Sequence, residues 1–119
     1  MLHQTLPGVP AAVDDARAWI RTVVQSQHPE VAVDVAVQVI GELVASAVRH
    51  TPKGGLVEIL VTPAARGGMV IEVKDPGGPS LEPNVGSWAD ISRDVLNFGA
   101  SSAEGGHRAW CELPQATRP

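Results

Sequence analysis

The feature that most constrains the fold is an apolar stretch, residues 31–50, in which hydrophobic side chains recur at helical spacing. Its first half, residues 31–39, also alternates like a β-strand and is rich in valine, which favours strands. An unbroken pattern of about twenty residues is too long for an ordinary strand. We therefore predict a helix from near Pro29 to His50, and the strand alternative stays open for its first half.

This predicted helix carries one compact line of polar side chains. Glu42 and Ser46 are four residues apart, and Arg49 and His50 follow one turn later. Residues three or four apart share a helix face, so these side chains should project together. Gly41 flanks the line without a side chain, which would let a ligand approach the helix backbone. The alternative is an ordinary amphipathic helix whose polar face meets water.

Weaker patterns on both sides of this helix predict the remaining elements. They are an edge strand at 2–6, a helix from Pro10 to about Gln27, paired strands at 56–62 and 69–74, a helix between Trp88 and Phe98, a connection at 100–106 and a last strand at 107–113. Helices that precede and interrupt a small sheet indicate an α+β fold, a two-layer α/β sandwich whose mixed, mostly antiparallel sheet is covered on one face by helices. We expect one domain over residues 1–119, with a frayed tail from about residue 115.

Composition argues against several classes of function. The formal charge is −4 and the nine Lys and Arg residues form no basic run, so we expect no nucleic-acid partner. Charged residues interrupt the longest apolar stretch and the N-terminus lacks the pattern of a signal peptide, so we expect no membrane partner. The single cysteine, Cys111, cannot form an internal disulfide, which fits a cytoplasmic location, and its strand position predicts a buried, inert thiol. The four histidines lack paired ligand spacing, which argues against a zinc site.

A second motif, Asp75 followed by Pro76, Gly77 and Gly78, comes directly after a predicted strand. An aspartate at the end of a strand can accept a hydrogen bond from the amino group of a ligand, and the glycines would let a flat ring lie against the backbone. A glutamate on a neighbouring helix, Glu42, could orient a water molecule or accept a hydroxyl proton. Taken alone, aspartate-proline-glycine is first of all a turn.

In this order, the Glu42–Thr51 helix motif, a hairpin, the Asp75–Gly78 turn and a terminal Ala109–Leu113 strand resemble the GHKL (Bergerat-fold) ATPases, a superfamily of histidine-kinase-like ATP-binding domains. Within it, the chain is most similar to the small bacterial anti-sigma factors with serine-kinase-type domains. The resemblance covers residues 2–113, which is nearly the whole chain.

The resemblance implies roles for individual residues. Glu42 would be the general base that activates a serine hydroxyl or water, and Asp75 would hold the adenine amino group, with Gly77 shaping that pocket. The implied cofactor-binding set is Asp75, Gly77, Gly78, Ser46, His50 and Arg108. The implied cofactors are ATP and magnesium, the metal at the position of Ser46.

The chain departs from the family pattern at three places. Ser46 stands where the family normally has the asparagine that coordinates magnesium, and it would hold the metal more weakly. The phosphate-binding glycine box is reduced to one glycine within residues 84–88. Arg108 replaces a threonine near the adenine, where it either blocks the pocket or reaches a phosphate. Because phosphoryl transfer depends on positioning and charge stabilisation, these losses predict a poor kinase.

We therefore favour a diverged anti-sigma-factor-like regulatory protein that acts by protein–protein binding, with ATP and magnesium binding weakened or lost. Its partner would be a sigma factor, an anti-sigma antagonist or a second copy in a homodimer. Two alternatives stay open. One is an active, ATP- and magnesium-dependent serine kinase of a partner-switching sigma-factor pathway, which would use Glu42. The other is a generic α+β interaction domain.

Overall fold

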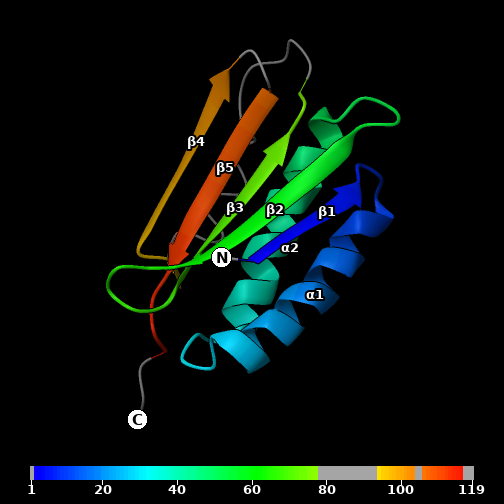
Figure 1. Cartoon of the computed structure of the whole chain (residues 1–119). Helices are drawn as coiled ribbons and strands as arrows, with labels where there is room; N and C mark the ends of the chain where they lie inside the picture. The colour runs from blue at the N-terminus through cyan, green and yellow to red at the C-terminus, as the bar shows by residue number, and fades with distance from the viewer. Residues whose placement is uncertain (1, 78–93, 104–105, 117–119) are drawn as a thin grey trace.

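The computed structural model describes residues 2–77, 94–103 and 106–116 and contains two helices and five strands in these ranges (Figure 1). In chain order the elements are β1 (Leu2–Pro7), α1 (Ala11–Gln27), α2 (Val33–His50), β2 (Leu56–Pro63), β3 (Met69–Asp75), β4 (Asn97–Ala103) and β5 (Gly106–Leu113). The predicted first strand, first helix, central hairpin and last strand are each confirmed within one residue at both ends.

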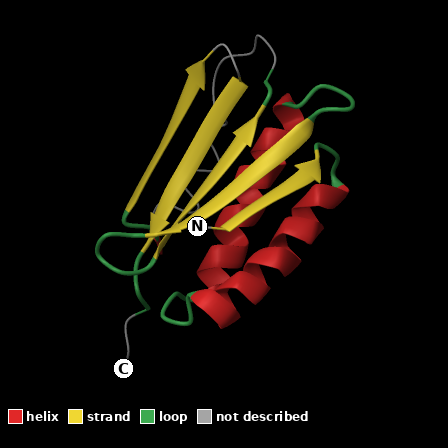
Figure 2. Ribbon diagram, viewed as in Figure 1, coloured by secondary structure: helices red, strands yellow, loops and turns green. Residues whose placement is uncertain are grey.

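The strands form one sheet in the order β1-β2-β3-β5-β4, and every neighbouring pair is antiparallel. Both helices lie on the same face of this sheet, as Figure 2 shows. Side chains alternate along β2 and β3, so that Val57, Ile59 and Ile71 are buried beneath the helices while their neighbours face outward. The predicted two-layer α+β sandwich is confirmed, with a sheet that is antiparallel at every described pairing.

The core lies between the two layers. Helix α2 contributes Ile40, Leu43 and Val44, which are at most 4% exposed, and α1 contributes Ile20. These side chains meet the inward residues of β2 and β3, so the helical period of one layer and the alternation of the other converge on a single apolar interior. None of the helices in the described ranges is long and apolar enough to cross a membrane.

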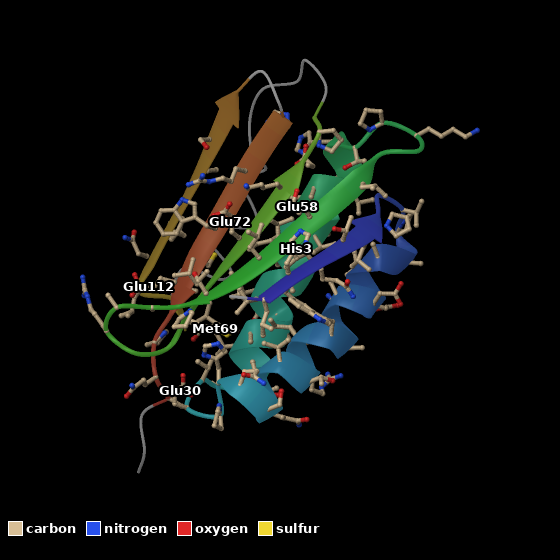
Figure 3. The ribbon with its side chains drawn as sticks, in the orientation of Figure 1. His3, Glu30, Glu58, Met69, Glu72 and Glu112 are labelled. Atoms are coloured by element: carbon tan, nitrogen blue, oxygen red, sulfur yellow. The ribbon has the colours of Figure 1, made fainter. Side chains whose placement is uncertain are left out.

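The outward face of the sheet carries charged pairs. Figure 3 shows His3 and Glu58 close together on neighbouring strands, and His3 Nε2 lies 3.1 Å from Glu58 Oε1. Glu72 Oε1 lies 3.6 Å from Lys74 Nζ and 3.6 Å from Arg108 Nε. Because these groups are partly exposed, their contribution to stability is small, roughly 0–1 kcal/mol for each pair.

Helix α2 begins at Val33, four residues after the predicted start at Pro29. Before the helix, Val31 is extended and forms an isolated antiparallel bridge with Gln115, and the N–H of Ala116 donates to the carbonyl of Glu30. The strand alternative is therefore correct only for Val31. From Val33 onward the chain is helical, because a helix buries the apolar side chains that recur at helical spacing. In the tail expected to fray from residue 115, the backbone of Gln115 and Ala116 pairs with the turn before α2, and residues 117–119 lie outside the described residues.

The predicted helix ending at Phe98 is wrong in its described part, because Asn97–Ala103 is strand β4. The predicted connection at 100–106 is wrong for the same reason, since most of it belongs to β4 or β5. Phe98 lies opposite Cys111 in the antiparallel register, and the N–H of Leu96 donates to the carbonyl of Glu112. Pairing with β5 therefore satisfies the backbone, and the apolar spacing seen in the sequence was too short to exclude it. Residues 88–93 of the predicted helix lie outside the described residues.

Candidate functional site

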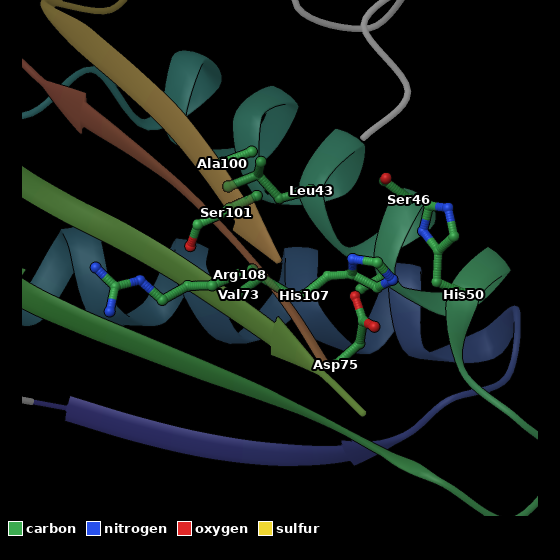
Figure 4. Close-up of a pocket in the computed structure, with 11 residues that line it drawn as sticks. Leu43, Ser46, His50, Val73, Asp75, Ala100, Ser101, His107 and Arg108 are labelled. Carbon is green, nitrogen blue, oxygen red and sulfur yellow. The ribbon is translucent and has the colours of Figure 1, made fainter. Parts of the chain in front are cut away.

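The C-terminal half of α2 lies over the adjacent strands β3 and β5. A small cavity lies between the helix and these strands, near the end of β3 and the start of β5 (Figure 4). Its lining residues are Leu43, Ser46, Ala47, His50, Val73, Asp75, Ala100, Ser101, His107, Arg108 and Ala109. Its volume is about 20 Å³, which is room for about one water molecule. Four of the residues predicted from the sequence are thus brought to one place: Ser46, His50, Asp75 and Arg108.

Asp75 ends β3 and is 8% exposed. Its Oδ1 atom is buried without a hydrogen-bond partner among the described residues. Burial raises the pKa of this carboxyl above its ordinary value, and the nearby His107 and His50 and the backbone N–H groups of Gly77 and His107 act in the opposite direction. The arrangement leaves a carboxylate oxygen that can accept a hydrogen bond from an incoming N–H or O–H group.

Two histidine rings meet above Asp75. The ring centroids of His50, from α2, and His107, from β5, are 5.1 Å apart at an angle of 47°. Figure 4 shows both imidazoles beside the Asp75 carboxylate. His107 also lies against Gly77, where a Cβ atom would come within 2.6 Å of His107 Cδ2. The open face of Gly77, expected to receive a ligand ring, is therefore in contact with a ring of the protein itself.

The predicted general base is placed differently. Glu42 precedes Ser46 by four residues, or about 6 Å along the helix axis, and it is partly buried. Within the part of the chain that the structure describes, Glu42 is not among the residues that line the cavity. Its carboxylate and the Asp75 carboxylate therefore do not share one enclosed site in this conformation.

Gly41 serves the packing of the two helices. A Cβ at this position would come within 2.6 Å of Arg17 Nε and 2.7 Å of Arg17 Nη2. The guanidinium of Arg17, which also lies 3.5 Å from Asp14 Oδ1, thus occupies the space beside the helix backbone. The expectation that a ligand approaches α2 at Gly41 is wrong, because a side chain of α1 already fills that space.

Arg108 contributes to the wall of the cavity, but its charged group points elsewhere. The guanidinium extends away from Asp75 (Figure 4) and its Nε lies 3.6 Å from Glu72 Oε1 on the outer face of the sheet. In this conformation the Arg108 guanidinium is directed to Glu72 and not into the space beside Asp75. Gly78 and the reduced glycine box at 84–88 lie outside the described residues.

The described residues do not fit a magnesium ion at Ser46. Magnesium requires near-octahedral oxygen ligands and retains several waters, whereas this cavity has a volume of about 20 Å³. Across the described ranges, we find no group of three or more His, Cys, Asp or Glu side chains placed to hold a metal ion.

Sequence reasoning missed His107, because nothing in the linear pattern links it to Asp75. The two residues are direct partners in the antiparallel register of β3 and β5. Only the pairing of β3 with β5 identifies His107, because β4 separates these two strands in the chain. The predicted burial of Cys111 is confirmed. The residue is fully buried, and burial raises the pKa of its thiol to about 12.

Two of the solved structures that resemble the chain are informative. One contains the RsbU and RsbW domains of Rv1364c from Mycobacterium tuberculosis, which is 25% identical over 99% of this chain and 33% of that chain, with a TM-score of 0.72. The other is the blue-light activated histidine kinase EL346 of Erythrobacter litoralis, which is 14% identical over 92% of this chain and 42% of that chain, with a TM-score of 0.60. No protein-family model and no curated protein sequence matches. The chain thus spans less than half of either structure, and its fold is that of a small GHKL-like domain, as the sequence resemblance predicted.

Proposed function

We propose that this chain is a diverged regulatory domain of the anti-sigma-factor type, which acts by binding a protein partner and has weakened or lost its binding of ATP and magnesium. The observation that carries the proposal is the small size of the cavity beside Asp75, which has about 20 Å³ of room where ligand pockets usually have roughly 300–1,000 Å³. The likeness to a chain that contains an RsbW domain supports a GHKL-type regulatory role.

The site keeps parts of a nucleotide pocket without the whole of it. The carboxylate of Asp75 is the group that would hold an adenine amino group, and its Oδ1 is available to accept that hydrogen bond. Ser46 offers one hydroxyl at the magnesium position, and the general base Glu42 does not line the cavity among the described residues. Phosphoryl transfer requires all of these groups in place at once, so we propose that the chain is not an active kinase.

The proposed partner is a sigma factor or an anti-sigma antagonist, and a homodimer is the arrangement in which a second copy takes part. Sigma factors act in the cytoplasm, so this location is part of the same proposal. The net charge of −4 fits a protein partner better than a nucleic acid. The domain would then act through its surface by binding a protein partner, and the Asp75 cavity would be the remnant of a nucleotide-binding site.

The test combines two measurements on the purified chain. Isothermal titration with magnesium-ATP should give a Kd above about 1 mM, weaker by at least about a hundredfold than that of a related domain with an intact glycine box. Size-exclusion chromatography with light scattering, in mixtures with each sigma factor and antagonist of the same genome, should reveal a stable complex.

Tight, magnesium-dependent ATP binding with transfer of phosphate to an antagonist would contradict the proposal and favour the serine-kinase alternative. In that case Glu42→Ala should abolish the transfer. The absence of any complex across the whole panel would instead favour a generic interaction domain.

A further inference from the structure

The side chain of His107 takes up the surface on which a flat ligand would lie. A Cβ atom on Gly77 would come within 2.6 Å of His107 Cδ2 and 2.8 Å of His107 Nε2, so the imidazole lies in contact with the glycine backbone. The same imidazole influences the Asp75 carboxyl electrostatically. The protein thus supplies its own aromatic ring between the two features, a bare glycine and a buried carboxylate, that suit an external ring.

The ring is held from the helix side as well. The imidazole of His50 contacts that of His107, with centroids 5.1 Å apart, a distance typical of paired aromatic rings. Because His50 belongs to α2 and His107 to β5, the pair bridges the two walls of the cavity. The space left beside the rings is about 20 Å³.

The shape of this internal ring is informative. Imidazole is the five-membered half of a purine, with the same two nitrogen positions around a flat ring. His107 places a flat ring against Gly77 and beside Asp75, the two groups that would hold the amino-bearing ring of an adenine. An external purine and the His107 ring therefore compete for one volume, since two sets of atoms cannot overlap in a packed interior.

We propose that His107 is an internal occupant of the ring-binding position, which closes this cavity to purine nucleosides. The inference rests on the proposed function only in treating the Asp75 cavity as the remnant of a nucleotide pocket. It assigns the closure to one side chain of this chain, independently of the phosphate end. Removing the imidazole should reopen the site while Asp75 and Gly77 stay in place.

The experiment measures binding of adenosine, which has no phosphates and so probes the ring end alone. In isothermal titration of the folded protein, His107→Ala and His107→Ser should each bind adenosine at least about tenfold more tightly than the parent. Two opening variants are used so that a folding defect in one does not decide the result, and thermal melts establish that each is folded. Adding Asp75→Asn to His107→Ala should remove the gain.

Two matched controls separate the ring from general loosening. His107→Phe keeps a flat ring of similar breadth, so its cavity should stay closed. Lys74→Ala truncates the residue before Asp75 on β3, whose ammonium lies 3.6 Å from Glu72 Oε1 on the outer face of the sheet, and should also leave adenosine affinity unchanged.

The inference is overturned if adenosine affinity is the same in the parent, His107→Ala and His107→Ser, or if His107→Phe gains as much as they do. Tight adenosine binding by the parent would overturn it too. None of these outcomes changes the test for a protein complex, so failure of the inference and failure of the proposed function are distinguishable.

Discussion

Asp75 is a carboxyl group whose protonation is linked to the stability of the whole chain. Burial raises its pKa above the ordinary value of 3.8, and this effect outweighs the opposing influence of His107 and His50. The folded state therefore binds a proton more readily than the unfolded state does. The free energy of unfolding consequently falls as pH rises from the unfolded to the folded pKa, and the penalty is complete above the folded pKa.

Replacing this group should stabilise the protein. We expect Asp75→Asn to raise the melting temperature at pH 7, because the amide carries no charge that burial disfavours. The difference from the parent should narrow as pH falls through the raised pKa of the Asp75 carboxyl, because the protonated acid, like the amide, carries no charge. Thermal unfolding followed by circular dichroism at several pH values measures both effects.

The control is Asp14→Asn, because the Asp14 side chain is 87% exposed and should shift the melting temperature little at any pH. A lower melting temperature for Asp75→Asn at pH 7 would show that the carboxylate stabilises the fold, contrary to this account.

Between the elements α1 and α2, the missing side chain of Gly41 leaves room for the side chain of Arg17. The Arg17 guanidinium lies over Gly41, and a methyl group added at Gly41 would be only 2.6 Å from Arg17 Nε, closer than a normal contact. Alanine is favoured over glycine within a helix by about 1 kcal/mol. In the parent, we expect Gly41→Ala to be nearly neutral, because displacement of the Arg17 side chain offsets the gain in helix propensity.

In an Arg17→Ala background the same change should stabilise the protein by about 1 kcal/mol. A double-mutant cycle in urea measures the difference as a coupling energy between the two positions. Asp14→Ala serves as the matched control, since it removes the ion pair of Arg17 but leaves its guanidinium over Gly41. Equal effects of Gly41→Ala in both backgrounds would mean that the arginine does not constrain this position.

The elements that could be predicted from the sequence are those with a strong local period. The two helices and the central hairpin show such periods, and so does the strand around Cys111. β4 could not be predicted, because Asn97–Ala103 is rich in small residues and gains its structure from pairing with β5. The same limit applies to the site. Ser46 and His50 share a helix face, which the sequence reveals, whereas His107 reaches Asp75 only through strand register.

For the whole molecule, the order of the strands sets which parts open first. β1 is an edge strand that pairs only with β2 among the described residues, whereas β3 is paired on both sides and covered by α2. We expect amide hydrogens of β3 to exchange only through global unfolding, at least about tenfold more slowly than those of β1. Hydrogen exchange with mass spectrometry measures this. Equal protection of the two strands would show that β1 does not open separately.

The position of His107 and Asp75 on two inner strands has a consequence for the rate at which a ligand could enter the site. His107 is carried by β5, which lies between β3 and β4, and Asp75 by β3, so peeling an outer strand does not separate them. Admission of a ligand ring therefore requires rotation of a side chain, an event far faster than separation of paired strands. The rate at which the site becomes accessible is then independent of the lifetime of the folded state.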